Sequence, residues 1–294
     1  MTNMVSKLEI PNKGFTHSGK FHADDVFSAA LLTYLNPEIK IFRGNQVPEG
    51  FDGIVFDIGG GEFDHHQSNH RFREDDTPYA AFGLLWEAFG ASIVGEEEAK
   101  RFESDFVQPL DISDNTGSPN MLANVISYFN PTWDSQCNHD DAFEEAKQFA
   151  LTILRKKFEL IDSIYRAQDM VTEALTKMEE DILVLPVSAP WKKFVKDTTT
   201  EFVVFPSNRG GYCAQAVPAE KDEEEDEHGL KVDFPKEWAG LRDEELEEKS
   251  NIRGLRFCHN SRFLIAADTL EGAIMACKAA KASREIEMRD GEKE

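Results

Sequence analysis

One long amphipathic pattern between about Asp141 and Met178 restricts the fold of this chain more than any other feature. Apolar residues recur there at intervals of three and four, which is the period of a helix with one buried face. The pattern is set by Phe143, Ala146, Ala150, Ile153, Leu154, Phe158, Ile161, Ile164, Val171 and Leu175. We therefore predict a linking helix over residues 141–180, which separates an N-terminal lobe (1–140) from a C-terminal lobe (181–294).

The N-terminal lobe alternates short apolar runs with helical patterns, which indicates an α/β architecture. Strands are predicted at 15–17, 39–42 and 53–58. The last of these, Gly-Ile-Val-Phe-Asp-Ile, is apolar enough to be central in a parallel sheet. Helices are predicted from Asp24 to Leu35 and from Thr77-Pro78 through about Phe89, where a polar cap precedes proline. We expect a mostly parallel sheet with flanking helices.

The C-terminal lobe is predicted to be a smaller α/β lobe. Its expected strands and closing helix are residues 182–187, 202–205, 212–217, 255–259, 263–267 and 270–286. An acidic run, Glu220–His228, interrupts the lobe, and we interpret residues 219–229 as a solvated loop because like charges without apolar residues do not form a core.

Composition narrows the class of protein. With 294 residues and 40% hydrophobic content, the chain has enough apolar side chains for a sizeable core. It lacks a run of about 18 apolar residues, which predicts no membrane span, and its N-terminus does not look like a secretion signal. The four cysteines are scattered without a Cys-x-x-Cys pair. A cytoplasmic location fits this pattern best.

The formal net charge of −23 argues against broad electrostatic adhesion to nucleic acid, which normally needs a basic surface. Part of the acid excess lies in the acidic run, and a metal site would neutralise more of it. A nucleotide or a short oligonucleotide therefore fits the charge better than a long duplex does.

Histidines and carboxylates are concentrated at or near the predicted strand ends. They are His17, His22, Asp24 and Asp25; Asp57, which precedes Gly59–Gly61; Asp64, His65 and His66; and Asp111 and Asp114. Sites in open α/β sheets form beyond the carboxyl ends of the strands. Mixed imidazole and carboxylate ligands suit Mn, Fe, Co or Zn, and two metals about 3.5–4 Å apart can clamp a phosphate and activate water. The pattern predicts a metal-dependent phosphoesterase.

Each of these residues also has an ordinary explanation when it is taken alone. Asp24 or Asp25 could cap the helix that begins there, and His22 could be a surface histidine. Asp111 and Asp114 lie three residues apart and could share an exposed helix face. His70, His139 and His228 are interpreted as solvated loop histidines. The density of candidates favours a site, and the competing hypothesis from another class is a scaffold protein that keeps the metal for structure.

Two motifs carry a resemblance to a known family. Thr-His-Ser-Gly-Lys-Phe-His-Ala-Asp-Asp (16–25) and Phe-Asp-His-His-Gln (63–67) resemble the melanocyte-proliferating-gene family, a branch of the Asp-His-His (DHH) phosphoesterase superfamily. The similarity continues through residues 106–115, 215–218, 238–246 and 257–263, so it covers nearly the whole chain.

The resemblance implies two lobes with an active cleft and two divalent ions, with Mn²⁺ expected first and Mg²⁺, Co²⁺ or Zn²⁺ as alternatives. It implies an exonuclease that hydrolyses RNA or short oligonucleotides. A small-nucleotide hydrolase or a pyrophosphate hydrolase is the alternative within the enzyme class. No membrane partner is expected, and the oligomeric state is not predicted.

The resemblance also implies roles for single residues. His17 and His22 would join Asp57 on one metal. The other metal would be held by Asp24, Asp57, His65 and Asp114. His66 would point toward the scissile phosphate, so His66 and Asp57 are the candidate catalytic residues. His22 departs from the superfamily, which usually has aspartate there.

Further candidates are expected around this set. Asp25, Asp64 and Asp111 are candidate ligands or supporting groups, and Asp114 is preferred to Asp111 because Asn-Thr-Gly follows it. In the second lobe, the resemblance implies substrate binding by His259, Asn260, Ser261 and Arg262, which are the nearest counterpart of a substrate-binding segment in the superfamily. Arg209 and Lys20 are further candidates, with an ordinary role as surface cations left open.

Overall fold

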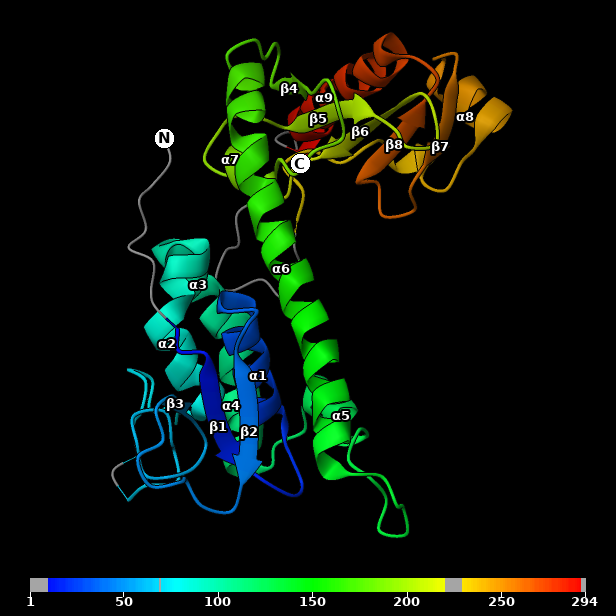
Figure 1. The fold of residues 1–294 in the computed structure, drawn as a ribbon. Coiled ribbons are helices and arrows are strands. Elements are labelled where there is room, and N and C mark those ends of the chain that lie inside the picture. Colours follow the sequence, from blue (N-terminus) through cyan, green and yellow to red (C-terminus); the bar gives the residue numbers. More distant parts are fainter. Residues whose placement is uncertain (1–9, 69, 220–228, 292–294) are drawn as a thin grey trace. The chain divides into compact units, whose positions relative to one another are not determined.

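The computed structural model describes residues 10–68, 70–219 and 229–291. The chain is α/β, as predicted, with a parallel three-stranded sheet and a mixed five-stranded sheet (Figure 1). The acidic run Glu220–His228, including His228, lies outside the described residues.

The three-stranded sheet has the order β2-β1-β3. Its strands are β1 (Lys13–His17), β2 (Lys40–Gly44) and β3 (Ile54–Val55). The prediction that residues 53–58 form a central strand is wrong, because β1 is central and β3 is a short edge strand. Ile54 and Phe56 are buried in the helical core, and Asp57 turns the chain with φ 56°. The apolar residues of segment 53–58 therefore indicate burial in the core and not a central position in the sheet.

The helices before the long one lie in the same unit as this sheet. They are α1 (Ala23–Leu35), α2 (Ala81–Val94), α3 (Glu96–Phe102), a π-helix (Glu103–Val107), α4 (Gln108–Thr116) and α5 (Met121–Ser127). The predicted start of α2 at Thr77-Pro78 is wrong. These residues fold back on Phe72 and Arg73, with Pro78 bridged to Phe72 and Arg73 N donating to Thr77 O at 2.9 Å. The polar cap signal belongs to that turn.

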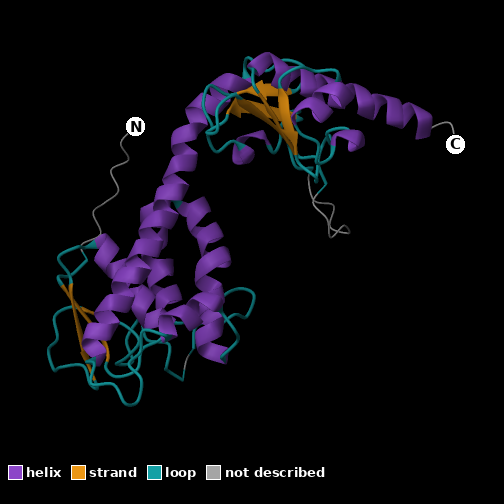
Figure 2. Cartoon of the chain, turned by 90° about the vertical axis from the view of Figure 1, so that its right-hand side faces the viewer, coloured by secondary structure: helices purple, strands orange, loops and turns teal. Residues whose placement is uncertain are grey.

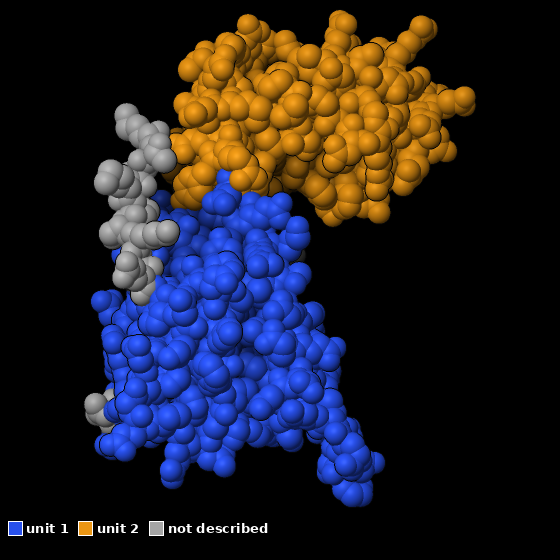
Figure 3. Space-filling view, viewed as in Figure 1, with its two compact units in different colours: residues 1–162 blue, residues 163–294 orange. Residues whose placement is uncertain are grey.

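The long helix α6 (His139–Leu175) forms where the amphipathic pattern predicts it. The chain divides into two compact units, residues 1–162 and 163–294 (Figure 3). The division falls inside α6, so the helix is part of both units. Phe143 and Leu154 belong to the core of the first unit, while Val171 packs with Leu183 and Trp191 in the second.

The second unit contains a five-stranded sheet in the order β4-β5-β6-β8-β7. Its elements are β4 (Ile182–Val184), α7 (Lys192–Val195), β5 (Phe202–Pro206), β6 (Tyr212–Ala216), a 3-10 turn (Lys236–Trp238), α8 (Asp243–Ser250), β7 (Leu255–Cys258), β8 (Leu264–Ala267) and α9 (Leu270–Gly291). Helix α9 covers one sheet face (Figure 2), and Cys277 of this helix belongs to the same buried cluster as Ala214 and Ile265. All four cysteines are free thiols. Within the described ranges, no helix is both long and apolar enough to cross a membrane.

Candidate metal centre

The candidate ligands meet at the carboxyl edge of the three-stranded sheet. His17 is the last residue of β1, and Asp57 follows β3 after one residue. Strands β2 and β3 both run parallel to β1, so their carboxyl ends share one edge. Helix α1 begins at this edge, directly after His22, and its N-terminal amides favour an anion there.

Asp57 is the central residue of the cluster. Its φ of 56° lies in the left-handed region, which aspartate adopts more readily than most residues, and the side chain is nearly buried. Asp57 Oδ2 lies 3.2 Å from His17 Nε2, while Asp57 Oδ1 lies 3.3 Å from His65 Nδ1. The two oxygens thus face two different histidines, which is the arrangement of a bridging carboxylate.

His17 is oriented by its surroundings. Its Nδ1–H donates to Ser18 O at 3.1 Å, and Nε2 faces Asp25 Oδ2 at 3.1 Å. Hydrogen bonds to Asp25 and then Asp57 raise the pKa of His17 to about 10. Asp25 also accepts a hydrogen bond from His22 N at 2.9 Å, so it caps α1 and faces His17 at once. A metal at Nε2 would displace the Nε2–H proton, from which these carboxylates now accept a hydrogen bond.

Asp24 and Asp114 form the other side of the cluster. Asp114 Oδ2, on α4, lies 3.1 Å from His65 Nε2. Asp24 is fully buried, and burial together with the charges of Asp57 and Asp114 raises its pKa well above the ordinary value. An ionised Asp24 therefore needs a nearby cation.

Asp64 holds His66 in place. His66 Nδ1 and the His66 amide both lie 3.0 Å from Asp64 Oδ1, while Gly60 N donates to Oδ2 at 2.7 Å. Although burial opposes it, these donors lower the pKa of Asp64. The His66 side chain is 61% exposed, so its Nε2 is the ring atom left to meet a substrate.

The residues at this edge fit divalent metal ions. Three groups of side chains offer ligand atoms within 4.8 Å of one another: Asp57, Asp64, His65 and His66; His17, Asp25 and Asp57; and His22, Asp24 and Asp114. Within the described part of the chain, both oxygens of Asp24 and Oδ1 of Asp57 are buried without a hydrogen-bond partner. Unpaired buried carboxylates cost much free energy, and bound cations would remove that cost.

The grouping differs from the one implied by the resemblance at His22. His22 lies with Asp24 and Asp114, and Asp25 takes the expected place of His22 beside His17 and Asp57. Asp111 lies apart from these groups: it pairs with Arg73 Nη2 at 2.6 Å and accepts from Gly83 N at 3.2 Å. Burial raises the pKa of Asp111 to about 7 against the effect of Arg73.

Of the substrate-binding candidates in the second unit, the structure places four in one turn and Arg209 in another. His259, Asn260, Ser261 and Arg262 form the turn between β7 and β8, and Arg209 lies in the turn between β5 and β6. Tyr212 pairs with Ala267 and Gln215 with Leu264, so the two turns are at opposite ends of a β6–β8 pairing about 10 Å long. Arg262 donates to Asp233 Oδ2 at 2.8 Å and to Phe234 O, which is a structural role. Lys20 is exposed in the loop between His17 and His22.

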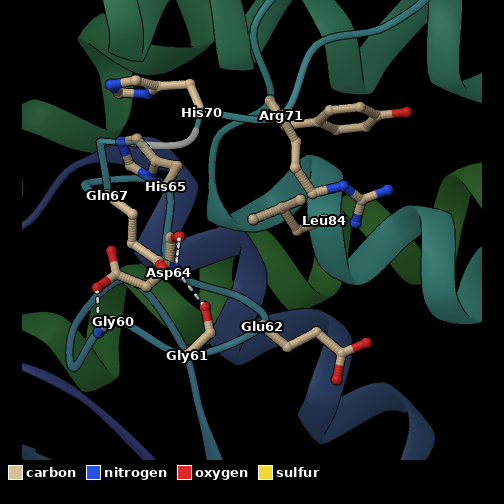
Figure 4. Close-up of a pocket in the computed structure, with 10 residues that line it drawn as sticks. Gly60, Gly61, Glu62, Asp64, His65, Gln67, His70, Arg71 and Leu84 are labelled. Atoms are coloured by element: carbon tan, nitrogen blue, oxygen red, sulfur yellow. Dashed lines mark hydrogen bonds between the residues drawn. The ribbon is translucent and has the colours of Figure 1, made fainter.

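Two hollows border the centre within the first unit. One, of about 340 Å³, is lined by Asp64, His65, Gln67, His70 and Arg71, among others (Figure 4). The other, of about 450 Å³, begins at His22 and Asp114 and continues along α5, past Asn124. A substrate held at the metals would therefore have room on both sides.

Three supporting residues were missed by sequence reasoning. Arg71 lines the first hollow, and its place five residues after His66 was the available signal. Arg73 pairs with Asp111 and Glu103. Asn130 fixes the loop before His22 by two hydrogen bonds with the backbone of Phe21, at 3.0 and 2.9 Å. Nothing in the sequence pattern marks Arg73 or Asn130, because their partners are distant along the chain.

Fold and site together define an α/β protein with a cluster of histidines and carboxylates suited to metal. The model of one family, described as "Uncharacterised protein family (UPF0160)" and named MYG1_exonuc, matches residues 14–280, and this chain belongs to that family. It is 29% identical to the MYG1 exonuclease of Homo sapiens, over 95% of this chain and 88% of that protein. It is 28% identical to MYG1 protein C694.04c of Schizosaccharomyces pombe, over 90% of this chain and 96% of that protein. No solved structure gave a significant match.

Proposed function

We propose that this chain is a metal-dependent phosphodiesterase of the DHH type that acts as an exonuclease on RNA or short oligonucleotides. The observation that carries the proposal is Asp57, whose two carboxylate oxygens face His17 and His65 in two different ligand groups. The Homo sapiens relative is named an exonuclease and is matched over 88% of its length, which supports a nucleic-acid substrate.

Two divalent ions, with Mn²⁺ expected first, would be held by His17, Asp25 and Asp57 on one side and by Asp24, His65 and Asp114 on the other, with Asp57 shared. His22 is a further ligand candidate beside Asp24. Such ions supply positive charge that polarises the phosphoryl group and lowers the pKa of water. The buried carboxylates hold this charge in place, and the N-terminus of α1 adds its amides at the same edge.

His66 is proposed as the residue that contacts the scissile phosphate. Asp64 accepts the Nδ1–H hydrogen bond, which fixes the tautomer and leaves Nε2 exposed. With a second proton on Nε2, the His66 ring would be an imidazolium, which can donate that proton to a phosphate oxygen or pass it to the leaving group. Asp64 is then a positioning residue, because it acts through His66.

The experiment is a hydrolysis panel with Mn²⁺ on 5′- and 3′-labelled short RNA, the equivalent DNA, a dinucleotide and pyrophosphate. Asp57→Ala is expected to lower RNA hydrolysis by a factor of about 10²–10³, while Asp52→Ala, which removes an exposed carboxylate of the same unit, leaves it unchanged. Wild-type turnover by Asp57→Ala would rule out the proposed mechanism. If only pyrophosphate is hydrolysed, the protein is a pyrophosphate hydrolase and not a nuclease. If Mn²⁺ raises stability and no phosphoester is cleaved, the scaffold hypothesis replaces the enzyme.

A further inference from the structure

A groove on the five-stranded sheet gathers cations and aromatic rings in the second unit, whereas the metal centre belongs to the first. It measures about 520 Å³, and its lining includes Arg209, Arg242, Arg256, Phe205 and Phe257. Cys213, Leu264 and Ala266 form its floor. Their neighbours Ala214, Ile265 and Ala267 point to the opposite face, where α9 packs. The groove is therefore an open sheet face backed by a formed core.

The cations of this groove stand out on a chain with a net charge of −23. Arg209 and Arg242 are exposed, and neither makes an ion pair within the described residues. Part of the charge of Arg256 is neutralised, because Arg256 Nε lies 3.4 Å from Asp268 Oδ1. Asp243 is the acid in the lining, so arginines outnumber carboxylates there.

Arg256 also fixes the turn that carries Arg209. Its Nη2 donates to Gly210 O at 2.5 Å and to Ala267 O at 3.3 Å. Gly211 in this turn has φ 66°, and a Cβ there would overlap Ala267 O, so the turn lies directly against β8. Arg209 is therefore presented from a turn whose backbone is held by the sheet.

Arg242 lies over Phe257, and this pair is called the aromatic platform. The Arg242 guanidinium lies 4.5 Å from the centre of the Phe257 ring, and residues 242 and 257 are bridged through their backbones. A nucleobase stacks on aromatic faces and guanidinium planes without regard to its sequence, and arginines bind the phosphates between bases.

We propose that this groove binds single-stranded nucleic acid, with Arg209 and Arg242 on phosphates and Phe257 under a base. The choice of ligand rests on the proposed function. The assignment moves substrate binding in this unit away from Arg262, which is engaged with Asp233. An acidic peptide would also meet the arginines, but it would leave the aromatic platform unused.

The test measures binding of a fluorescein-labelled RNA octamer to the full chain by fluorescence anisotropy, with chelator present so that hydrolysis and the metal centre do not contribute. Salt is varied from about 50 to 200 mM. For single strands, each lost phosphate contact is expected to reduce the slope of log K against log salt by about 0.7. Arg209→Ala and Arg242→Ala should each weaken binding and show this reduction.

Phe257→Leu should weaken binding about five-fold or more, with the salt slope unchanged, because it removes stacking and no charge. Arg289→Ala is the matched control: it removes an exposed arginine from α9, which packs on the other sheet face, and binding should stay as in the wild type. Arg262→Ala should also leave the slope unchanged. Thermal melting of each variant separates lost binding from lost folding.

Unchanged binding by Arg209→Ala and Arg242→Ala, or a slope change in Arg262→Ala instead, overturns the assignment. Competition by hexaglutamate as strong as by unlabelled RNA overturns it too. These outcomes are independent of the proposed function. If the protein hydrolyses RNA but the groove variants bind RNA as the wild type does, only the groove assignment is rejected. If the groove variants lose RNA binding but the wild type hydrolyses no RNA, only the proposed nuclease activity is rejected.

Discussion

The carboxylates of the metal centre have environments that shift their pKa values in opposite directions. Asp24 and Asp25 are buried and have raised pKa values, whereas Asp64 and Asp114 have lowered ones. Asp64 receives backbone amides and Asp114 faces His65, but no donor reaches Asp24 within the described residues. A cation beside Asp24, whose oxygens have no hydrogen-bond donor, would therefore stabilise the cluster most.

The first prediction concerns His17 in metal-free protein. Its folded pKa of about 10 lies above the ordinary 6.5, so its contribution to stability is complete below pH 6.5 and is lost as pH rises toward 10. Melting temperatures in chelator should fall across this window, and His17→Gln should flatten the fall. A wild-type curve that rises from pH 7 to 9.5, unchanged in the variant, would contradict this.

The second prediction concerns Asp24→Asn. The folded pKa of Asp24 is raised, so its ionisation lowers stability as pH rises above the ordinary 3.8. At neutral pH the variant should melt about 2–4 °C higher than wild type in chelator, which corresponds to ~1 kcal/mol. It should also lose most of the stabilisation by Mn²⁺. Calorimetry with and without Mn²⁺ checks both effects, and a variant that melts lower yet keeps its Mn²⁺ response would refute the assigned role.

At the scale of elements, Arg73 joins segments that are distant in sequence. Its guanidinium contacts Glu103 on the π-helix and Asp111 on α4, and it donates to Pro78 O at 3.0 Å. Helix α4 also carries Asp114, so this network holds one ligand in its place.

The third prediction is that Arg73→Met lowers the free energy of unfolding by about 3–5 kcal/mol, because buried carboxylates lose their cation. Arg71→Met is the control. Its ion pair with Glu87 is about half exposed, and such pairs contribute about 0–1 kcal/mol. Urea denaturation of both variants measures the difference, and equal losses would show that burial of the pair does not decide its effect.

At the scale of the whole molecule, the two units have separate cores, and all metal-ligand candidates lie in the first. The fourth prediction is that calorimetry of the full chain resolves two transitions, of which Mn²⁺ raises one. An ion at 100 times its Kd adds about 2.7 kcal/mol to the part that binds it. Asp57→Ala should remove the shift, and an equal shift of both transitions would contradict the separation.

The sequence by itself determined the elements whose periodicity is strong and local. The amphipathic repeat predicted α6, and the motifs at residues 17–25, 57 and 64–66 predicted which side chains gather at the sheet edge, because parallel strands bring their carboxyl ends together. Family membership followed from the same motifs. The two-metal assignment, the cytoplasmic location and the division of roles between lobes stay predictions.

Only the tertiary structure decided how these pieces pair. The apolar run at 53–58 could not reveal that β3 is an edge strand. Apolar residues are needed wherever a strand is buried, whether helices or neighbouring strands cover it. Nor could spacing place Asp25 rather than His22 beside His17, or commit Asp111 to Arg73. The sequence motifs favoured Arg262 over Arg209 as a substrate-binding residue, and strand register places the turns that carry these two arginines at opposite ends of one sheet. Each of these outcomes depends on contacts between distant residues, which local patterns do not encode.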